Sequence, residues 1–534
     1  MEPLPVTIQK MFKSSQFKIK SCDGMKILKL KTKPLDMETG RNIVVLHEDD
    51  AEELGHFPGD RVKISTPKAT IIAIANATRR MVQRGELGTL DEVTKSLELK
   101  LGDLVEVTLA PQPQSVAAIK KKMDGQQLSS EEIGAIIRDI VDDSLTTTEM
   151  AAFVVAEHIR DMTTSEIVAL THHMVETGDK LELEAKPILD VHSIGGVPGN
   201  KYALVVVPIV AAAGLTIPKT SSRAITSGAG TADVMEVLAN VTLSLNEIKE
   251  IVRKVGAVLA WGGAVRLAPA DDIIIHTERM LGIDPHCQLL ASVMSKKLAV
   301  GADHILIDIP TGPGAKVKSV DDARSLAHDF MELGHKLNVQ VEAAVTYGGQ
   351  PVGHAVGPAL EAREALEVLL GGGPGSVIEK STSLAGIMLE LGGTVAHGLG
   401  KETAMEILKS GNAYQKMREI IGAQGGNPSV KPEDIHIGDK KALLTAPYSG
   451  YVTQIYNQRI NDIVRAAGAP RHKGAGIILL SKERRKIEKG EPLLEIYSEH
   501  EAMLDEALAV AKRNPPVKIE GMLLEKFSER PRIG

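Results

Sequence analysis

Two loops rich in small residues, at 193–200 and 221–231, carry the strongest chemical signal in this 534-residue chain. The first reads Ser-Ile-Gly-Gly-Val-Pro-Gly-Asn, and the second reads Ser-Ser-Arg-Ala-Ile-Thr-Ser-Gly-Ala-Gly-Thr. Backbone N–H groups of a Gly-rich turn, with Ser and Thr hydroxyls beside them, form a concave donor surface that suits an anion. Either loop alone could be a plain turn. The pair, with Arg223 and Lys219 adjacent, predicts a phosphate held from two sides.

An apolar run from 204 to 215 separates the two loops. Such a run is typical of a buried parallel strand with its packing helix. A third Gly-rich loop, at 310–318, directly follows the apolar segment 305–309. In an α/β sheet such a loop lies at the carboxyl end of a strand, where ligands bind.

The loops also carry a resemblance. Residues 222–236, Ser-Arg-Ala-Ile-Thr-Ser-Gly-Ala-Gly-Thr-Ala-Asp-Val-Met-Glu, resemble the signature of the thymidine and pyrimidine-nucleoside phosphorylase family. Residues 190–196, Asp-Val-His-Ser-Ile-Gly-Gly, resemble that family's Asp-Lys-His-Ser-Thr-Gly-Gly motif, with Val191 in place of its lysine. That change, and the Pro-Gly-Asn-Lys at 198–201, match the archaeal branch of the family, the AMP phosphorylases. The similarity runs from about residue 27 to the C-terminus.

The resemblance implies a pentosyltransferase that splits nucleoside 5′-monophosphates with inorganic phosphate. AMP and phosphate would give adenine and ribose 1,5-bisphosphate in nucleotide degradation or salvage, and CMP and UMP are plausible further substrates. No cofactor and no metal are expected, since phosphate is itself a substrate. Two alternatives stay open: a pyrimidine-nucleoside phosphorylase acting on thymidine or uridine, and a non-catalytic binding or assembly protein with a degenerate core.

Cleavage of an N-glycosidic bond passes through an oxocarbenium-like sugar, by analogy with glycoside chemistry. The protein must hold phosphate beneath C1′ and steady the departing base, often by protonating it. The resemblance places the proton donor at Asp284. A carboxylic acid that stays protonated near neutral pH needs a raised pKa, which burial against apolar neighbours provides. An Asp before a Pro is by itself more often a turn or a helix cap, and the family match favours the acid.

The resemblance also assigns nucleotide- and phosphate-binding residues. They are Gly196, Ser222, Arg223, Ala224, Ile225, Thr226, Ser227, Thr231, Ser292 and Lys316. His192 and Ser193 belong to the first phosphate loop and form a second tier with Lys296. Ser292 matches a serine that contacts the base, and Lys296 matches a lysine that holds the pyrimidine ring in nucleoside-cleaving members; an ordinary helix-end cation is the alternative for Lys296.

Position 191 matters because Val191 cannot bind phosphate through its side chain. Arg223 and Lys201 are candidates to replace the missing lysine, although a solvated surface role is as consistent with Lys201. Lys316 stands where the nucleoside-cleaving members have an apolar residue, so we expect it to bind the 5′-phosphate; a solvated loop lysine is the alternative. A hydrogen bond to a charged group contributes about 1.5–3 kcal/mol, or roughly 10–150-fold in affinity.

Two other groups of residues lead to no site. Asp271 and Asp272 could suggest a metal site like that of related phosphoribosyltransferases, but no partner carboxylates form a recognisable motif with them, which favours a helix N-terminus. Cys22 and Cys287 are far apart and provide neither a disulfide framework nor metal-ligand spacing, which fits a reducing cytoplasm.

The elements that position these residues predict a multidomain α/β protein. An echo between 51–64 and 97–107, each with a short helix, a Gly-Asp turn and an alternating strand, predicts a double-psi-like β-barrel. Capping-box patterns predict a small all-α domain, and alternating apolar runs and amphipathic helices predict a large α/β domain with a central mixed sheet. Short strands and turns predict a C-terminal α+β domain.

The expected ranges are 1–26 for an extension without an assigned role, 27–110 for the barrel, 116–180 for the helical domain, 183–438 for the α/β catalytic domain and 439–534 for the C-terminal domain. The resemblance implies that the helical and catalytic domains share a cleft. It also implies a homodimer formed through the helical domain, and we expect the barrel to mediate a larger homo-multimer.

The composition fits a globular intracellular protein. Hydrophobic residues make up 43% and charged residues 25%, and the net charge of −7 argues against a dedicated nucleic-acid binder. The first ten residues lack the apolar core of a signal peptide, and the apolar run at 202–218 is too short to span a bilayer comfortably. We therefore expect a cytoplasmic protein without membrane or nucleic-acid partners.

Overall fold

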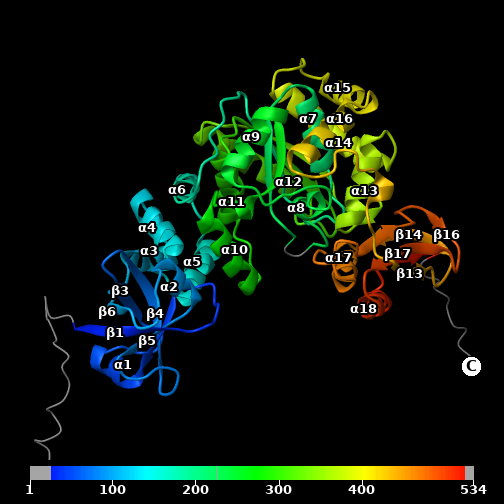
Figure 1. Cartoon of the computed structure of the whole chain (residues 1–534). Coiled ribbons are helices and arrows are strands. Elements are labelled where there is room, and N and C mark those ends of the chain that lie inside the picture. Colours follow the sequence, from blue (N-terminus) through cyan, green and yellow to red (C-terminus); the bar gives the residue numbers. More distant parts are fainter. Residues whose placement is uncertain (1–25, 225–226, 524–534) are drawn as a thin grey trace, which may run out of the picture. The chain divides into compact units, whose positions relative to one another are not determined.

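The computed structural model of the chain describes residues 26–224 and 227–523 (Figure 1). The expected extension at 1–26 lies, apart from Lys26, outside the described residues. The chain forms two compact units. The first contains the residues up to His173 together with Pro269–Gln288, and the second contains Met174–Ala268 and the residues from Leu289 onward.

The first unit begins with a closed barrel of six strands, in the order β1-β5-β2-β4-β3-β6 (Figure 1, blue). The strands are β1 (Ile27–Pro34), β2 (Ile43–His47), β3 (Arg61–Ser65), β4 (Thr70–Thr78), β5 (Glu86–Thr89) and β6 (Leu104–Leu109). Val44, Leu46, Val62 and Ile64 are among the alternating apolar residues that fill its core. An N-terminal β-barrel is therefore confirmed.

The two halves of the barrel correspond to the repeat in the sequence at 51–64 and 97–107. Exchanging β1 with β4, β2 with β5 and β3 with β6 reproduces the same strand order and the same parallel and antiparallel pairs. Two short helices, α1 (Glu48–Leu54) and α2 (Asp91–Ser96), follow β2 and β5. The Gly-Asp turn before β3 has Gly59 at φ +94°, and the turn before β6 has Gly102 at φ +86°, a region that favours glycine.

A helical bundle completes the first unit. It contains α3 (Gln114–Met123), α4 (Ser130–Val141), α5 (Thr147–Arg160), α6 (Thr164–Glu176), which runs on into the second unit, and α10 (Pro269–Leu281). The capping boxes expected at the starts of α4 and α5 are present. Because α10 packs against α4 and α5, Pro269–Gln288 return to this unit although the sequence pattern placed them in the range 183–438. Asp271 and Asp272 lie in the first turn of α10.

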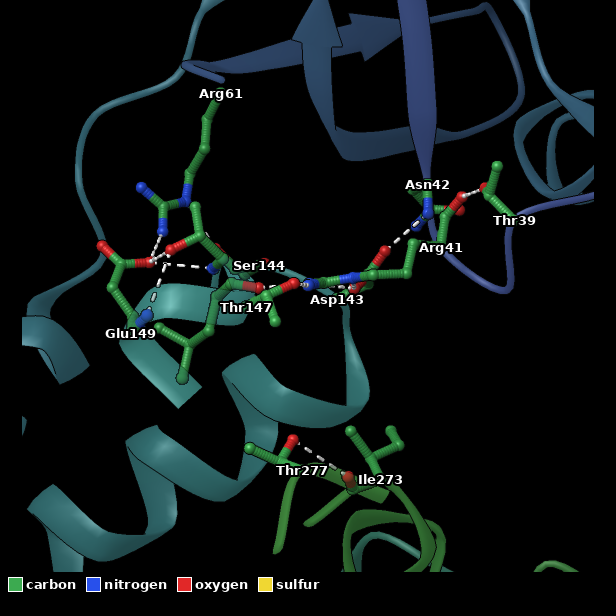
Figure 2. Close-up of polar contacts among 12 residues, drawn as sticks. Thr39, Arg41, Asn42, Arg61, Asp143, Ser144, Thr147, Glu149, Ile273 and Thr277 are labelled. Atoms are coloured by element: carbon green, nitrogen blue, oxygen red, sulfur yellow. Dashed lines mark hydrogen bonds and ion pairs between the residues drawn. The ribbon is translucent and has the colours of Figure 1, made fainter. Parts of the chain in front are cut away.

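Polar contacts around Asp143 fasten the barrel to the bundle (Figure 2). Arg41 donates to Asp143 Oδ1 from Nε at 2.8 Å and from Nη2 at 2.5 Å, and the N–H of Asn42 donates to Oδ2 at 2.5 Å. Arg61 binds the Ser144 carbonyl and the Glu149 carboxylate. Because Asp143 follows α4, one carboxylate fixes the β1–β2 connection to the bundle.

A parallel sheet forms the centre of the second unit. It contains β7 (Leu189–Ser193), β8 (Ile217–Ser221), β9 (Ala257–Trp261), β10 (His304–Thr311) and β11 (Gln340–Tyr347). The orders are β11-β10-β7 and β8-β9, joined by a bridge between Ile188 and Thr216. Every described pair is parallel, so the expected mixed sheet is corrected to a parallel one. The reason is that helices carry the chain back between successive strands.

Helices surround this sheet. They are α7 (Ala203–Ala212), α8 (Thr231–Met235), α9 (Leu245–Val255), α11 (His286–Ala299), which begins in the first unit, α12 (Val320–Lys336), α13 (Pro358–Leu369), α14 (Gly375–Leu391), α15 (Gly400–Lys409) and α16 (Asn412–Ala423). Almost every residue of α7 is buried, and α14, α15 and α16 pack against it (Figure 1). Among the described helices, none is long and apolar enough to cross a membrane.

The last part of the second unit is the α+β domain that short strands and turns predict (Figure 1, orange and red). It contains β13 (Lys440–Thr445), β14 (Gly450–Ile455), α17 (Asn457–Ala466), β15 (Gly476–Leu479), β16 (Lys486–Ile487), β17 (Pro492–Ser498), α18 (Glu501–Arg513) and β18 (Val517–Glu520). One sheet takes in β12 (Ala355–Val356), in the order β12-β15-β17-β13. The C-terminal domain therefore shares a sheet with a segment of the predicted catalytic domain.

Candidate functional site

A cavity of about 390 Å³ lies within the second unit, where three loops meet α17. Its lining residues are Gly196 from the first loop, Ser222, Arg223, Ala224, Ser227 and Gly230 from the second, Gly314, Ala315 and Lys316 from the third, and Gln458 and Asn461 from α17. The structure thus brings together Gly196, Ser222, Arg223, Ala224, Ser227 and Lys316 from the residues that the sequence singles out. Ile225 and Thr226 lie outside the described residues.

The parallel sheet explains why the three loops converge. They follow β7, β8 and β10, and the carboxyl ends of parallel strands meet at one edge of a sheet. Gly196 has φ +84°, and a Cβ atom there would lie 2.8 Å from the backbone nitrogen of Lys316. Only glycine therefore allows the first loop to approach the third this closely.

Asp233 organises the second loop. Its Oδ2 accepts hydrogen bonds from the backbone N–H of Ala224 at 2.7 Å and of Gly230 at 3.0 Å. A Cβ atom at Gly230 would lie 2.8 Å from the nitrogen of Ala224 and from the carbonyl oxygen of Ser222. The loop therefore folds back on a buried carboxylate, with Ser222 and Ala224 at the cavity wall.

Arg223 lines the cavity but is bound by carboxylates. Its Nη1 and Nη2 donate to the two oxygens of Glu236 at 2.6 and 2.5 Å, and Nη1 lies 3.4 Å from Asp233. The guanidinium also stacks 4.7 Å from the ring centre of Trp261. Arg223, with help from Lys473, lowers the pKa of Glu236 to about 2. The positive charge of Arg223 is thus already matched, so it is a poor replacement for the family's lysine.

Lys201 fits neither expectation for it. Its Nζ is buried, lies 2.6 Å from Glu364 Oε2, and donates to the carbonyls of Val352 and Ala355 at 3.1 Å each. The residue is therefore neither a solvated surface lysine nor a ligand of the phosphate loops. Its ammonium holds the segment between β11 and β12 against α13, and three protein acceptors satisfy it.

A buried charged cluster lies at the base of the first loop. Lys297 Nζ is 2.7 Å from Asp190 Oδ2, and Lys219 Nζ is 4.0 Å from Asp190 Oδ1. Burial, reinforced by the charge of Lys297, lowers the pKa of Lys219 to about 7. Val191, at the position of the family's lysine, is fully buried in β7. A second lysine therefore stands close to the altered position, on the neighbouring strand.

The charges of several lysines, among them the expected residues Lys296 and Lys316, act on His192. Burial lowers its pKa well below the usual value, and the ammonium groups of Lys297, Lys219, Lys296 and Lys316 lower it further. Beside it, Ser193 Oγ accepts a hydrogen bond from Asn200 Nδ2 at 3.0 Å. Four lysines thus act on the end of β7, an arrangement that favours an anion there.

The other expected residues lie apart from the cavity lining. Asp284 is exposed, between α10 and α11, so the first unit does not provide the apolar enclosure expected for a protonated carboxylic acid. Ser292 and Lys296 are half-buried and four residues apart on α11, which places them on one face of that helix. Thr231 is the first residue of α8.

Two cavity residues, Gln458 and Asn461, carry no signal that the sequence analysis could detect. Both are amides on the short helix α17 of the C-terminal domain, in which the sequence predicts no site residue. Gln458 is exposed and donates to Asp462 at 2.9 Å, whereas Asn461 is buried and accepts the N–H of Gly228 at 3.2 Å. Only the tertiary packing of α17 against the second loop reveals them.

One further cluster has ligand atoms that a metal could use. His472, Glu499 and His500 lie in the C-terminal domain, with His472 Nδ1 3.2 Å from Glu499 Oε2. The two imidazole rings meet edge to face, 4.7 Å between centres. The Glu499 carboxylate also accepts the N–H of Gly474 at 2.7 Å, so a hydrogen-bonded turn accounts for this arrangement. Asp271 and Asp272 belong to no such cluster among the described residues.

Three segments of the chain that follow the barrel match domains of known protein families. Residues 116–178 match the helical bundle domain of the glycosyl transferase family, and residues 185–414 match the α/β domain of that family. Residues 451–518 match the C-terminal domain of pyrimidine nucleoside phosphorylase. An anthranilate phosphoribosyltransferase from Thermus thermophilus aligns over 58% of this chain and 99% of its own, at 21% identity and a TM-score of 0.49.

Relatives cover nearly the whole chain. AMP phosphorylase from Thermococcus kodakarensis is 57% identical over 94% of this chain and 99% of its own length. AMP phosphorylase from Pyrococcus furiosus is 56% identical over 93% and 98%, and that from Methanococcoides burtonii is 49% identical over 94% and 99%. The match extends through the barrel, the three loops and α17. The chain belongs to the AMP phosphorylase family.

Proposed function

We propose that the chain cleaves AMP with inorganic phosphate, giving adenine and ribose 1,5-bisphosphate. The observation that carries this proposal is the cavity where the first and second loops meet the third loop, which contains Lys316. An enzyme that cleaves nucleosides needs one anion site, for the attacking phosphate. An enzyme that cleaves nucleotides needs a second anion site, for the 5′-phosphate of the substrate, and the loops offer donors for both.

The attacking phosphate binds near the end of β7, beside His192 and Ser193. The positive neighbourhood of His192 supports this placement. Lys219 supplies the cationic contact that Val191 lacks. The two residues occupy matching positions on adjacent strands, because Val191 lies three residues beyond Ile188 and Lys219 lies three residues beyond Thr216, the pair that forms the bridge. The ammonium has moved to the neighbouring strand.

The remaining residues have the roles that family resemblance implies. Lys316 binds the 5′-phosphate, and Ile225, Thr226 and Thr231 contribute to the second loop. Asp284 protonates the departing base, while Ser292 and Lys296 contact it. CMP and UMP are further substrates. The reaction needs no cofactor or metal, because phosphate is the nucleophile and a carboxylic acid the proton donor.

The chain assembles as a homodimer through the helical domain, and the double-psi-like barrel builds a larger homo-multimer in the cytoplasm. Sizing a chain that lacks residues 1–110 tests the role of the barrel. A smaller assembly that keeps its secondary structure supports it, and an unchanged number of subunits contradicts it.

Adenine release from AMP, measured with and without inorganic phosphate, tests the proposed activity. Adenosine, thymidine and uridine at equal concentration are the comparison substrates. Release that depends on phosphate and favours AMP over adenosine supports nucleotide phosphorolysis. Faster cleavage of nucleosides than of their 5′-monophosphates identifies a pyrimidine-nucleoside phosphorylase instead, and no release from any substrate supports the non-catalytic alternative.

A further inference from the structure

The α17 helix of the C-terminal domain packs directly on two of the three cavity loops. Asn461 Oδ1 accepts the N–H of Gly228, in the second loop, at 3.2 Å. A Cβ atom at Gly228 would lie 2.4 Å from Val464 Cγ1, so the helix and the loop are in close contact. Asn457 donates to the carbonyl of Gly348 at 2.9 Å and lies beside Gly314 of the third loop. The helix therefore forms part of the cavity wall.

The hydrogen bond from Gly228 fixes the orientation of the Asn461 amide. Since Oδ1 accepts, the other end of the amide is the Nδ2 donor. Asn461 is 5% exposed and lines the cavity, yet no described residue accepts a hydrogen bond from Nδ2. Because Oδ1 is occupied by the N–H of Gly228, Nδ2 is the end of the amide that can donate to a ligand in the cavity.

The lining indicates which part of a nucleotide would bind there. The described residues of the wall provide hydroxyls, glycine and alanine backbone, two amides, Arg223 and Lys316, and they include no aromatic or large apolar side chain. Such a wall suits a phosphate group and offers nothing for a base to stack on. Hydroxyl and amide donors beside an ammonium are the usual partners of phosphate oxygens.

We infer that Asn461 is a nucleotide-binding residue, whose Nδ2 donates a hydrogen bond to an oxygen of the 5′-phosphate in the cavity that Lys316 also lines. This inference rests on the proposed function and deepens it, because it makes the C-terminal domain a part of the nucleotide site. The domain then contributes to the preference for nucleotides over nucleosides through a side chain that the loops themselves do not contain.

The substitution Asn461→Asp separates binding from structural support. A carboxylate oxygen can still accept the N–H of Gly228, while the donor becomes an anionic oxygen that repels phosphate. We expect the Kd for AMP, measured by calorimetry on the full chain, to rise by about 10–150-fold or more, with the Kd for adenosine unchanged. The same change at the exposed Asn514, in the same domain, is the control and should leave both values unchanged.

Two results would overturn the inference. If Asn461→Asp binds AMP as tightly as the wild type, Asn461 serves only to hold Gly228. If AMP and adenosine lose affinity equally, the loop has been disturbed and the 5′-phosphate is not the partner. Should the Asp variant fail to fold, Asn461→Ala removes both the Nδ2 donor and the acceptor of the Gly228 N–H without adding charge, so a loss of affinity confined to AMP supports the inference and an equal loss for adenosine contradicts it. Wild-type protein that binds AMP but releases no adenine would refute the proposed reaction and leave this binding test intact.

Discussion

Lys297 Nζ lies 2.7 Å from Asp190 Oδ2, and both side chains are completely enclosed by protein. Lys219 Nζ stands 4.0 Å from the other oxygen of the same carboxylate. One buried carboxylate therefore faces the amino groups of two lysines beneath the first phosphate loop. A bound phosphate would supply further negative charge to this cluster. Without phosphate, the pKa of Lys219 is lowered to about 7, and this makes the free energy of unfolding depend on pH.

Without phosphate, Lys219 should make the stability of the protein rise with pH in the alkaline range. Its pKa falls from 10.5 to about 7 on folding, so at intermediate pH the unfolded chain binds a proton that the native protein does not. By linkage, the free energy of unfolding increases between about pH 7 and pH 10. Lys219→Met removes the part of this increase that Lys219 contributes, whereas Lys482, whose pKa burial lowers to about 8, keeps its own part. Urea unfolding across that range measures the difference between the two proteins.

Lys254→Met, at an exposed lysine of α9, is the matched control and should keep the wild-type pH profile. The histidines with lowered pKa, such as His192, act at lower pH and do not interfere. An identical slope in the Lys219→Met variant would show that the buried ammonium stays protonated throughout the range.

Lys316 should distinguish AMP from adenosine. Lys316→Met removes a charge-assisted hydrogen bond to the 5′-phosphate, so we expect kcat/KM for AMP to fall by about 10–150-fold, with little change for adenosine. Lys318→Met changes another exposed lysine of the same loop and should not affect either substrate. Equal losses for AMP and adenosine would instead place Lys316 at the attacking phosphate.

The sequence predicts the three loops well because their signal is local: glycine and small hydroxyl residues mark the turns. The apolar run at 305–309 lies in β10, as expected. The run at 204–215, expected to hold a strand with its packing helix, forms only α7, and the strand before the second loop is β8. The expected loop residues Gly196, Ser222 and Lys316 accordingly lie around one cavity. The barrel follows for the same reason, since its two halves repeat a pattern of turn and strand.

The remaining features depend on contacts between distant segments. Lys201 is a buried partner of Glu364, which follows it by 163 positions, so no local pattern distinguishes it from a phosphate ligand. Asn461 acts through the packing of α17 on the second loop, and α10 returns to the bundle through its tertiary contacts. The mixed sheet was wrong because the apolar runs do not encode strand direction.

Asp284 should be needed for turnover more than for binding. Asp284→Asn keeps the size of the side chain but cannot give a proton to the departing base, so kcat for AMP should fall by about 10²–10⁴-fold. The Kd for AMP should stay within a few-fold of the wild-type value. Asp505→Asn, at an exposed position of α18, controls for the charge change. Full activity in the Asp284→Asn variant would exclude this residue as the acid.

Asp143 should hold the barrel to the helical bundle. Asp143→Ala removes the carboxylate that accepts from both Arg41 and the N–H of Asn42 (Figure 2), and leaves Arg41 with Thr147 Oγ1 and the Leu145 carbonyl as acceptors. Since these are hydrogen bonds to a charged group, we expect the first unit to lose about 1.5–3 kcal/mol and the linker at 111–113 to be cleaved faster in limited proteolysis. Asp124→Ala, exposed at the end of α3, should change neither. Unchanged melting and cleavage would mean that Arg61 and Glu149 fasten the barrel on their own.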